Sequence, residues 1–218
     1  MAFSLSIYPW VYKAQYDGKG GWTEGYDEKP HKTPEQEAVL PAADPSATCI
    51  LLTHLHADHV SALRDYPNAR LIGDAEAAEH FLKVGALGRT RHGVFKELLP
   101  QDLMARLTPL SSLKAVEAPF GLGPARDVFG DGDVLALPLP GHMKGHTGYL
   151  FAMQPVPLLY AGDADWLASA LREGRSPGAP ARWILDDPAA ARDTARRINV
   201  FASAGGRVVL CHDPEPAE

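Results

Sequence analysis

Residues 48–60 read TCILLTHLHADHV, a short aliphatic run followed directly by three histidines and an aspartate. The run Thr48–Thr53 has the continuous apolar character of a strand that is buried on both faces. The pattern H-x-H-x-D-H that follows is expected by chance on the order of once in a thousand sequences of this composition. The stretch therefore predicts a buried strand that delivers a cluster of metal-binding side chains.

The spacing inside the cluster favours two neighbouring metal sites. In an extended segment that leaves a strand, residues i and i+2 point the same way, so His54 and His56 can bind one ion. Asp58 and His59 lie where the chain should turn into a helix that begins near Val60, which directs their side chains toward a second ion. Isolated histidines would more simply be surface or core residues, but this cluster is too dense for that interpretation.

Three further groups of the same chemistry follow predicted strands. His142 and His146 lie in a glycine-rich loop, PGHMKGHT (140–147), Asp163 follows a strand at 158–161, and His212 follows the last strand, Arg207–Leu210. Loops at the ends of packed strands hold functional side chains rigidly and leave them open to substrate. We therefore expect these side chains to join the first cluster.

The rest of the pattern predicts mixed strands and helices without strict alternation. Further strands are expected at 69–72, 113–118, 127–129, 134–139 and 148–153, and helices at 74–84, about 100–107 and 188–203. Asp74 and Asp187 are expected to cap two of the helices, and Ala191, Ala195, Ile198 and Ala202 form an apolar stripe on the last one. Residues 1–45 are predicted to be irregular, apart from an alternating segment at 3–13 that is compatible with a strand interrupted at Pro9.

Composition limits the class of protein. The chain has 218 residues, 45% of them hydrophobic, which predicts one domain over residues 1–218. A net charge of -6 disfavours nucleic acid and anionic membranes as partners. No apolar run is long enough to span a bilayer, and the first 14 residues lack the pattern of a signal peptide, so a cytoplasmic location is expected. Two cysteines, Cys49 and Cys211, are too few for a disulfide framework.

The ordered set of ligand-type residues resembles the metallo-β-lactamase superfamily of dinuclear hydrolases, over roughly residues 48–214. The resemblance implies an αββα four-layer sandwich with two zinc ions at one edge; iron or manganese also suits such ligands. It implies that one ion is held by His54, His56 and His142 and the other by Asp58, His59 and His212. Asp163 would bridge the two ions.

Two departures from the superfamily pattern concern the surroundings of the site. An Asp-Thr-Gly-like turn usually precedes the H-x-H-x-D-H segment, and residues 15–45 contain none. Three explanations are open: the site is supported differently, the N-terminal sheet is abbreviated, or the start site is placed too far downstream. Met143 and Lys144 replace a small residue and a proline in the third motif, and this change leaves His142 in place.

Neighbours of the proposed ligands are expected to have supporting roles. His146 is predicted to support the site rather than to bind metal. Cys211 precedes His212 on an expected strand and should therefore face away from the metals as a buried small hydrophobe, as should Cys49. Trp166 stands three residues after Asp163, where lactonase-like relatives have a substrate-contacting tyrosine, so a role in the wall of the substrate pocket is expected.

The resemblance implies hydrolysis of a small-molecule lactone, ester, thioester or amide by a hydroxide shared between the metals, with Asp58 as the catalytic proton carrier. Phosphodiester hydrolysis, as in other members of the superfamily, is an alternative. An iron-dependent oxidoreductase of the persulfide-dioxygenase kind is another, and a non-catalytic metal-binding module is disfavoured because no ligand is missing. His31, His80 and His92 have no expected role.

Overall fold

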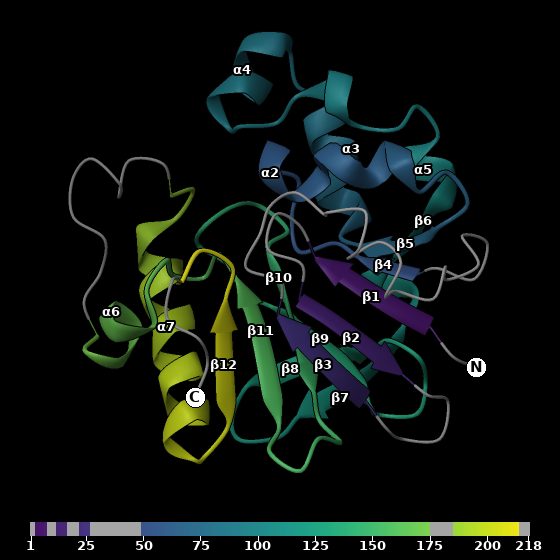
Figure 1. Cartoon of the computed structure of the whole chain (residues 1–218). Helices are drawn as coiled ribbons and strands as arrows, with labels where there is room; N and C mark the ends of the chain where they lie inside the picture. Colours follow the sequence, from purple (N-terminus) through teal and green to yellow (C-terminus); the bar gives the residue numbers. More distant parts are fainter. Residues whose placement is uncertain (1–2, 8–11, 17–21, 27–48, 175–184, 214–218) are drawn as a thin grey trace. The chain divides into compact units, whose positions relative to one another are not determined.

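The computed structural model describes residues 3–7, 12–16, 22–26, 49–174 and 185–213 (Figure 1). The chain divides into two compact units, Met1–Thr108 and Pro109–Glu218. Each unit contains strands and helices, so the mixed α/β class predicted from the sequence is confirmed.

The first unit contains two three-stranded sheets. One is an antiparallel sheet in the order β1-β2-β3, and the other has the order β4-β5-β6 with β4 and β5 parallel. The strands are β1 Phe3–Ile7, β2 Tyr12–Tyr16, β3 Trp22–Tyr26, β4 Cys49–Leu51, β5 Arg70–Gly73 and β6 Leu107–Pro109. The prediction that residues 1–45 are irregular is therefore wrong for β3. Trp, Thr and Tyr favour strands, but β3 exists through its pairing with β2, which no local period reveals.

Short helices fill the rest of the first unit. They are α2 Ala57–Val60, η2 Ser61–Asp65, α3 Ala75–Lys83, α4 Ala86–Arg91, η3 Lys96–Leu98 and α5 Leu103–Arg106. The predicted cap of α3 is confirmed, because the Asp74 carboxylate accepts a hydrogen bond of 2.8 Å from the Ala77 N–H. Ala77, Ala78 and Phe81 form the buried face of this helix.

The second unit is built on a six-stranded sheet in the order β12-β11-β10-β9-β8-β7. Its strands are β7 Lys114–Ala118, β8 Gly123–Asp127, β9 Val134–Pro138, β10 Thr147–Phe151, β11 Leu158–Gly162 and β12 Arg207–Leu210. All residues of β10 and β11 are buried, and β11 pairs in parallel with β12. The core consists of Ala118, Leu122, Ala125, Leu135, Leu137, Leu139, Leu150, Leu159, Ala161, Leu171, Ile198, Phe201 and Leu210.

One strand of this sheet lies earlier in the chain than predicted. The sequence predicts a strand at 127–129, whereas β8 ends at Asp127. The Asp127 carboxylate accepts hydrogen bonds from the N–H groups of Gly130 and Gly132 at 2.9 and 3.2 Å, so the chain turns there. The side chain that starts the turn also ends the strand.

Among the described residues the second unit also contains the helices α6 Ala168–Arg172 and α7 Pro188–Ser203 and the short η4 Leu110–Ser112. The bounds of α7 agree with the predicted helix, and α7 packs beside β12 (Figure 1). Its buried residues are Thr194, Ile198 and Phe201, so the predicted alanine stripe is only partly the core face. Thr194 is buried because its hydroxyl donates a 2.7 Å hydrogen bond to the Pro140 carbonyl.

Within the described ranges, none of the helices has both the length and the apolar character needed to cross a bilayer.

The cap of α7 is open to a direct test. Asp187 accepts hydrogen bonds from the N–H groups of Ala189 and Ala190, so Asp187→Ala is expected to lower the free energy of unfolding by about 1 kcal/mol. Asp187→Ser should retain most of the stability because serine also caps. Asp193→Ala removes an exposed aspartate from the same helix and should cost less than about 0.5 kcal/mol. Equal losses for both alanine variants in urea unfolding would contradict the cap.

Candidate metal centre

The first group of candidate ligands lies just after β4, where the chain is still extended. His54 is buried, and its Nε2 lies 2.9 Å from Nδ1 of His56, with the two rings edge to face. The ring of His59 is also close, with its centroid 4.1 Å from that of His54. Three imidazoles are therefore clustered within this unit, and such a set suits a metal ion.

Helix α2 changes the direction of the chain between His56 and His59. The His59 N–H donates to the His56 carbonyl at 3.0 Å, which closes the turn. The Asp58 carboxylate lies 3.7 Å from Nε2 of His59 and is about half exposed, at 47%. Asp58 is thus the ligand-type side chain of this group that is most open to solvent.

Thr53 and Gly93 hold the histidines in place and were not predicted from the sequence. The buried Thr53 hydroxyl lies 3.0 Å from Nδ1 of His54 and 3.4 Å from Nδ1 of His59. A hydroxyl oxygen that accepts from both Nδ1–H groups leaves the Nε2 atoms to other partners. Gly93 has φ +64°, and a Cβ there would lie 3.1 Å from the ring of His56. The one available signal was the position of Thr53 at the end of the strand, directly before the first histidine.

The second group of candidate ligands surrounds the carboxylate of Asp163. This aspartate directly follows β11 and is 4% exposed. Nε2 of His142 lies 3.4 Å from its Oδ2, and Nε2 of His212 lies 3.3 Å from the same oxygen. Because β11 and β12 run in parallel, Asp163 and His212 emerge at the same end of the sheet. One buried carboxylate oxygen therefore faces two imidazoles.

A close approach of backbone segments holds the loop that carries His142. Gly141 has φ +129°, and a Cβ at this position would lie 2.3 Å from backbone atoms of Ala191 in α7. The Asp187 N–H donates to the Gly141 carbonyl at 3.0 Å. Only glycine allows this contact, so the start of α7 fixes the position of His142.

His146 binds the backbone at both of its ring nitrogens. Its Nδ1 lies 2.9 Å from the Leu139 carbonyl, to which it donates, and its Nε2 accepts from the Asp163 N–H at 3.1 Å. The ring is 1% exposed, and these two bonds define a neutral imidazole with the proton on Nδ1. Both nitrogens are thus engaged in orienting the segment that bears Asp163.

Cys211 does not face away from the ligands, so the sequence-based prediction of its orientation is wrong. Strand β12 ends at Leu210, and Cys211 and His212 lie in a turn, where strand alternation no longer applies. The ligand atoms of Cys211, Asp163 and His212 lie within 4.8 Å of one another. The prediction that both cysteines are buried is correct. Burial raises the pKa of the Cys49 thiol, although nearby Arg70 opposes the shift.

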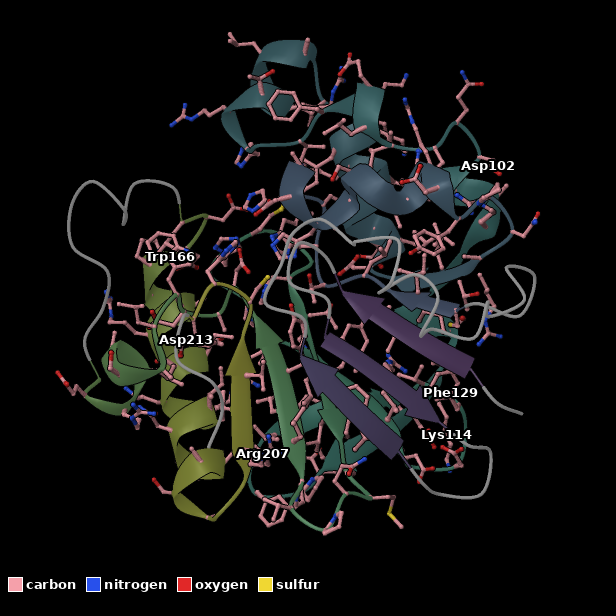
Figure 2. The ribbon with its side chains drawn as sticks, viewed as in Figure 1. Asp102, Lys114, Phe129, Trp166, Arg207 and Asp213 are labelled. Atoms are coloured by element: carbon pink, nitrogen blue, oxygen red, sulfur yellow. The ribbon has the colours of Figure 1, made fainter. Side chains whose placement is uncertain are left out.

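A cavity of about 200 Å³ opens beside Asp163 within the second unit. Trp166 is part of its wall and lies beside the start of α7, at the opposite end of the sheet from Arg207 (Figure 2). The Trp166 N–H donates to the Asp165 carboxylate at 2.7 Å, and Asp213 accepts from the Ala168 N–H at 2.8 Å. These bonds fix the turn that follows Asp163.

Two of the histidines without an expected role pack on an aromatic ring. His80 and His92 lie with their ring centroids 5.1 and 5.6 Å from that of Phe81. His31 lies outside the described residues.

The sequence of residues 21–211 matches the model of the metallo-beta-lactamase superfamily. The chain belongs to this superfamily. The match includes both groups of histidines and aspartates up to Cys211, with His212 directly after it.

Curated members of the superfamily with similar sequences are hydrolases. The N-acyl homoserine lactonase AttM of Azorhizobium caulinodans is 25% identical over 179 residues, which cover 76% of this chain and 58% of the lactonase. A hydroxyacylglutathione hydrolase of Pseudomonas entomophila is 34% identical over 123 residues, 56% of this chain and 35% of that protein. The chain therefore spans less than two thirds of the length of these relatives.

Solved structures of the superfamily share the fold. The dizinc quorum-quenching lactonase AidC aligns with a TM-score of 0.62 and 14% identity, over 95% of this chain and 73% of its own. An N-acyl homoserine lactone hydrolase, solved with the product N-hexanoyl-L-homoserine, aligns with a TM-score of 0.60 and 18% identity over 89% of this chain and 67% of its own.

The role of His146 as a support can be measured without any metal. His146→Leu leaves the buried Leu139 carbonyl and Asp163 N–H without this partner, so the free energy of unfolding should fall by about 2 kcal/mol or more in the presence of a chelator. His80→Leu changes an exposed histidine and should alter stability by less than about 0.5 kcal/mol. Similar free energies of unfolding for the two variants in urea would show that the hydrogen bonds of His146 do not stabilise the fold.

Proposed function

We propose that this chain is a dinuclear, metal-dependent hydrolase that cleaves a lactone, ester, thioester or amide bond of a small molecule. The observation that carries the proposal is the buried Asp163 carboxylate, of which one oxygen faces the imidazoles of His142 and His212 at 3.4 and 3.3 Å. Membership of the superfamily and the curated lactonase and hydroxyacylglutathione hydrolase support it further.

We propose two ligand sets. One ion would be held by His54, His56 and His142, and the other by Asp58, His59 and His212. Asp163 would bridge the two ions, a role for which a carboxylate between imidazoles of two different loops is suited. The clustering of His54, His56 and His59 after β4 supports the part of these sets that the first unit supplies.

The donor set fits zinc. Neutral imidazoles and carboxylates are ordinary zinc ligands, and the side chains of His54, His142 and Asp163 are buried, as in a site that shields its ions. The description of AidC as a dizinc enzyme is consistent with two zinc ions in this chain. When bound, zinc supplies a Lewis acid and lowers the pKa of water to about 7.

Residues of the chain would supply proton transfer and hold the ligands in position. Asp58, half exposed and 3.7 Å from His59, would take a proton from the attacking water and pass it to the leaving group. Thr53 and His146 hold ligand-bearing segments in position through hydrogen bonds. No serine or cysteine nucleophile is needed in this scheme.

Metal analysis and a substrate panel test the proposal together. Bound metal and oxygen consumption would be measured on the protein as purified, and the zinc-loaded protein would be offered an acyl lactone, a thioester and bis-nitrophenyl phosphate. We expect two zinc ions per chain and hydrolysis of an acyl substrate. Phosphodiester cleavage alone, or one iron with oxygen consumption, would overturn the proposal.

The role of Asp58 is tested by Asp58→Asn in the same assay. General acid–base catalysis contributes about 10²–10⁴-fold, so kcat should fall by that factor. Asp65→Asn changes an exposed aspartate at the end of η2 and should leave kcat within about twofold. Retained metal with undiminished hydrolysis in Asp58→Asn would contradict the proton-carrying role.

A further inference from the structure

We propose that the cavity beside Asp163 is the acyl subsite of the enzyme and that it selects short acyl groups ending in a carboxylate, which pairs with Arg192. This inference rests on the proposed hydrolase function and names its substrate class. The described residues that line the cavity all belong to the second unit, from Asp163 to Asn199.

The size of the cavity limits the group that it accepts. Its volume of about 200 Å³ lies below the range of about 300–1,000 Å³ typical of sites for drug-sized ligands. A short acyl group therefore suits the cavity better than a long fatty chain.

The lining of the cavity combines apolar and charged residues. Trp166, Leu171 and Ala195 provide apolar surface, while Asp163 and Arg192 also belong to the lining. The Asp163 carboxylate faces the proposed metal ligands His142 and His212, so we place the reacting carbonyl of a substrate beside it. In this proposal the acyl chain extends along the apolar lining residues and its terminal carboxylate binds Arg192.

One face of α7 supplies the polar side of the cavity. Arg192, Ala195, Arg196 and Asn199 all line it, and their spacing of i, i+3, i+4 and i+7 defines a single helix face. Asn199 donates a hydrogen bond to the Leu171 carbonyl, which fixes the wall formed by α6. This hydrogen bond joins α7 to α6 at the wall of the cavity.

The arginines of this helix differ in their partners. Arg196 pairs with Asp193, and Arg197 donates to the carbonyls of Leu122 and Pro138. For Arg192 no hydrogen bond or ion pair is found among the residues that the structure describes, and its side chain is exposed. Its guanidinium is therefore available to a carboxylate, which it can bind through two parallel hydrogen bonds.

The aspartates near the cavity have other partners than the Arg192 guanidinium. The Asp163 carboxylate faces His142 and His212, Asp165 accepts from the Trp166 N–H, and Asp193 is paired with Arg196. A carboxylate brought by the substrate would balance the charge of Arg192. We infer that a glutaryl-sized acyl group is preferred over a neutral chain of the same length.

The first test compares two thioesters of one thiol, the glutaryl and the pentanoyl derivative, with the zinc-loaded full chain. Because charge-assisted hydrogen bonds are strong, kcat/KM should be about tenfold or more higher for the glutaryl compound. Arg192→Gln should reduce this ratio to about one. Arg91→Gln, an exposed arginine on α4 of the other unit, should leave the ratio unchanged. A ratio near one in the unmodified protein, or a ratio unaffected by Arg192→Gln, would overturn the proposal.

A second variant, Trp166→Ala, tests whether the cavity wall limits the length of the acyl group. Trp166→Ala enlarges the cavity, so the chain length with the highest kcat/KM should shift to a longer dicarboxylic acyl group. A purely structural role of Trp166 would lower all rates without changing their order across chain lengths. An unchanged order of preference would therefore contradict the assignment of the cavity as the acyl subsite.

A binding measurement separates this proposal from the hydrolase function itself. Glutarate and pentanoate would be titrated into the metal-free and the zinc-loaded protein, with the indole N–H signal of Trp166 followed by NMR. Perturbation by glutarate that is lost in Arg192→Gln would support the subsite even if no thioester were hydrolysed. Hydrolysis of both thioesters without any such perturbation would reject the subsite and leave the hydrolase function standing.

Discussion

The carboxylate of Asp163 is almost completely buried, and its burial governs the arrangement of the second unit. An ionised carboxylate removed from water is costly unless charged or hydrogen-bonding partners surround it. Here the partners are the imidazoles of His142 and His212, with His146 holding the backbone of the same residue. These partners come from two loops, one between β9 and β10 and one after β12, so the strands β9 to β12 must keep their order for this aspartate to be tolerated.

In the first unit, the ligand-type side chains that cluster after a strand are mainly histidines. His54, His56 and His59 converge after a buried strand, and Thr53 contacts two of them through Nδ1. The turn at Gly93 lies against the ring of His56. In both units the ligand-type side chains stand on short loops that leave rigid strands, and nearby polar groups determine which ring nitrogen points outward.

Much of this organisation follows from the sequence because the signals are local. The H-x-H-x-D-H spacing, the cap at Asp187 and the short aliphatic runs each depend on residues that are neighbours in the chain. Strand β3 was missed because it depends on pairing with β2 rather than on its own period. The orientation of Cys211 was predicted wrongly because β12 ends one residue before it. The supporting roles of Thr53 and Gly93 depend on contacts between ring atoms and a hydroxyl or a backbone turn, which no sequence pattern encodes.

The central claim is that the proposed histidine and aspartate ligands bind two metal ions. X-ray diffraction from crystals of the zinc-loaded protein, measured on both sides of the zinc absorption edge, tests it most directly. The account predicts two anomalous peaks, one contacted by His54, His56 and His142 and the other by Asp58, His59 and His212, with Asp163 touching both. A single peak, or peaks contacted by other residues, would contradict it.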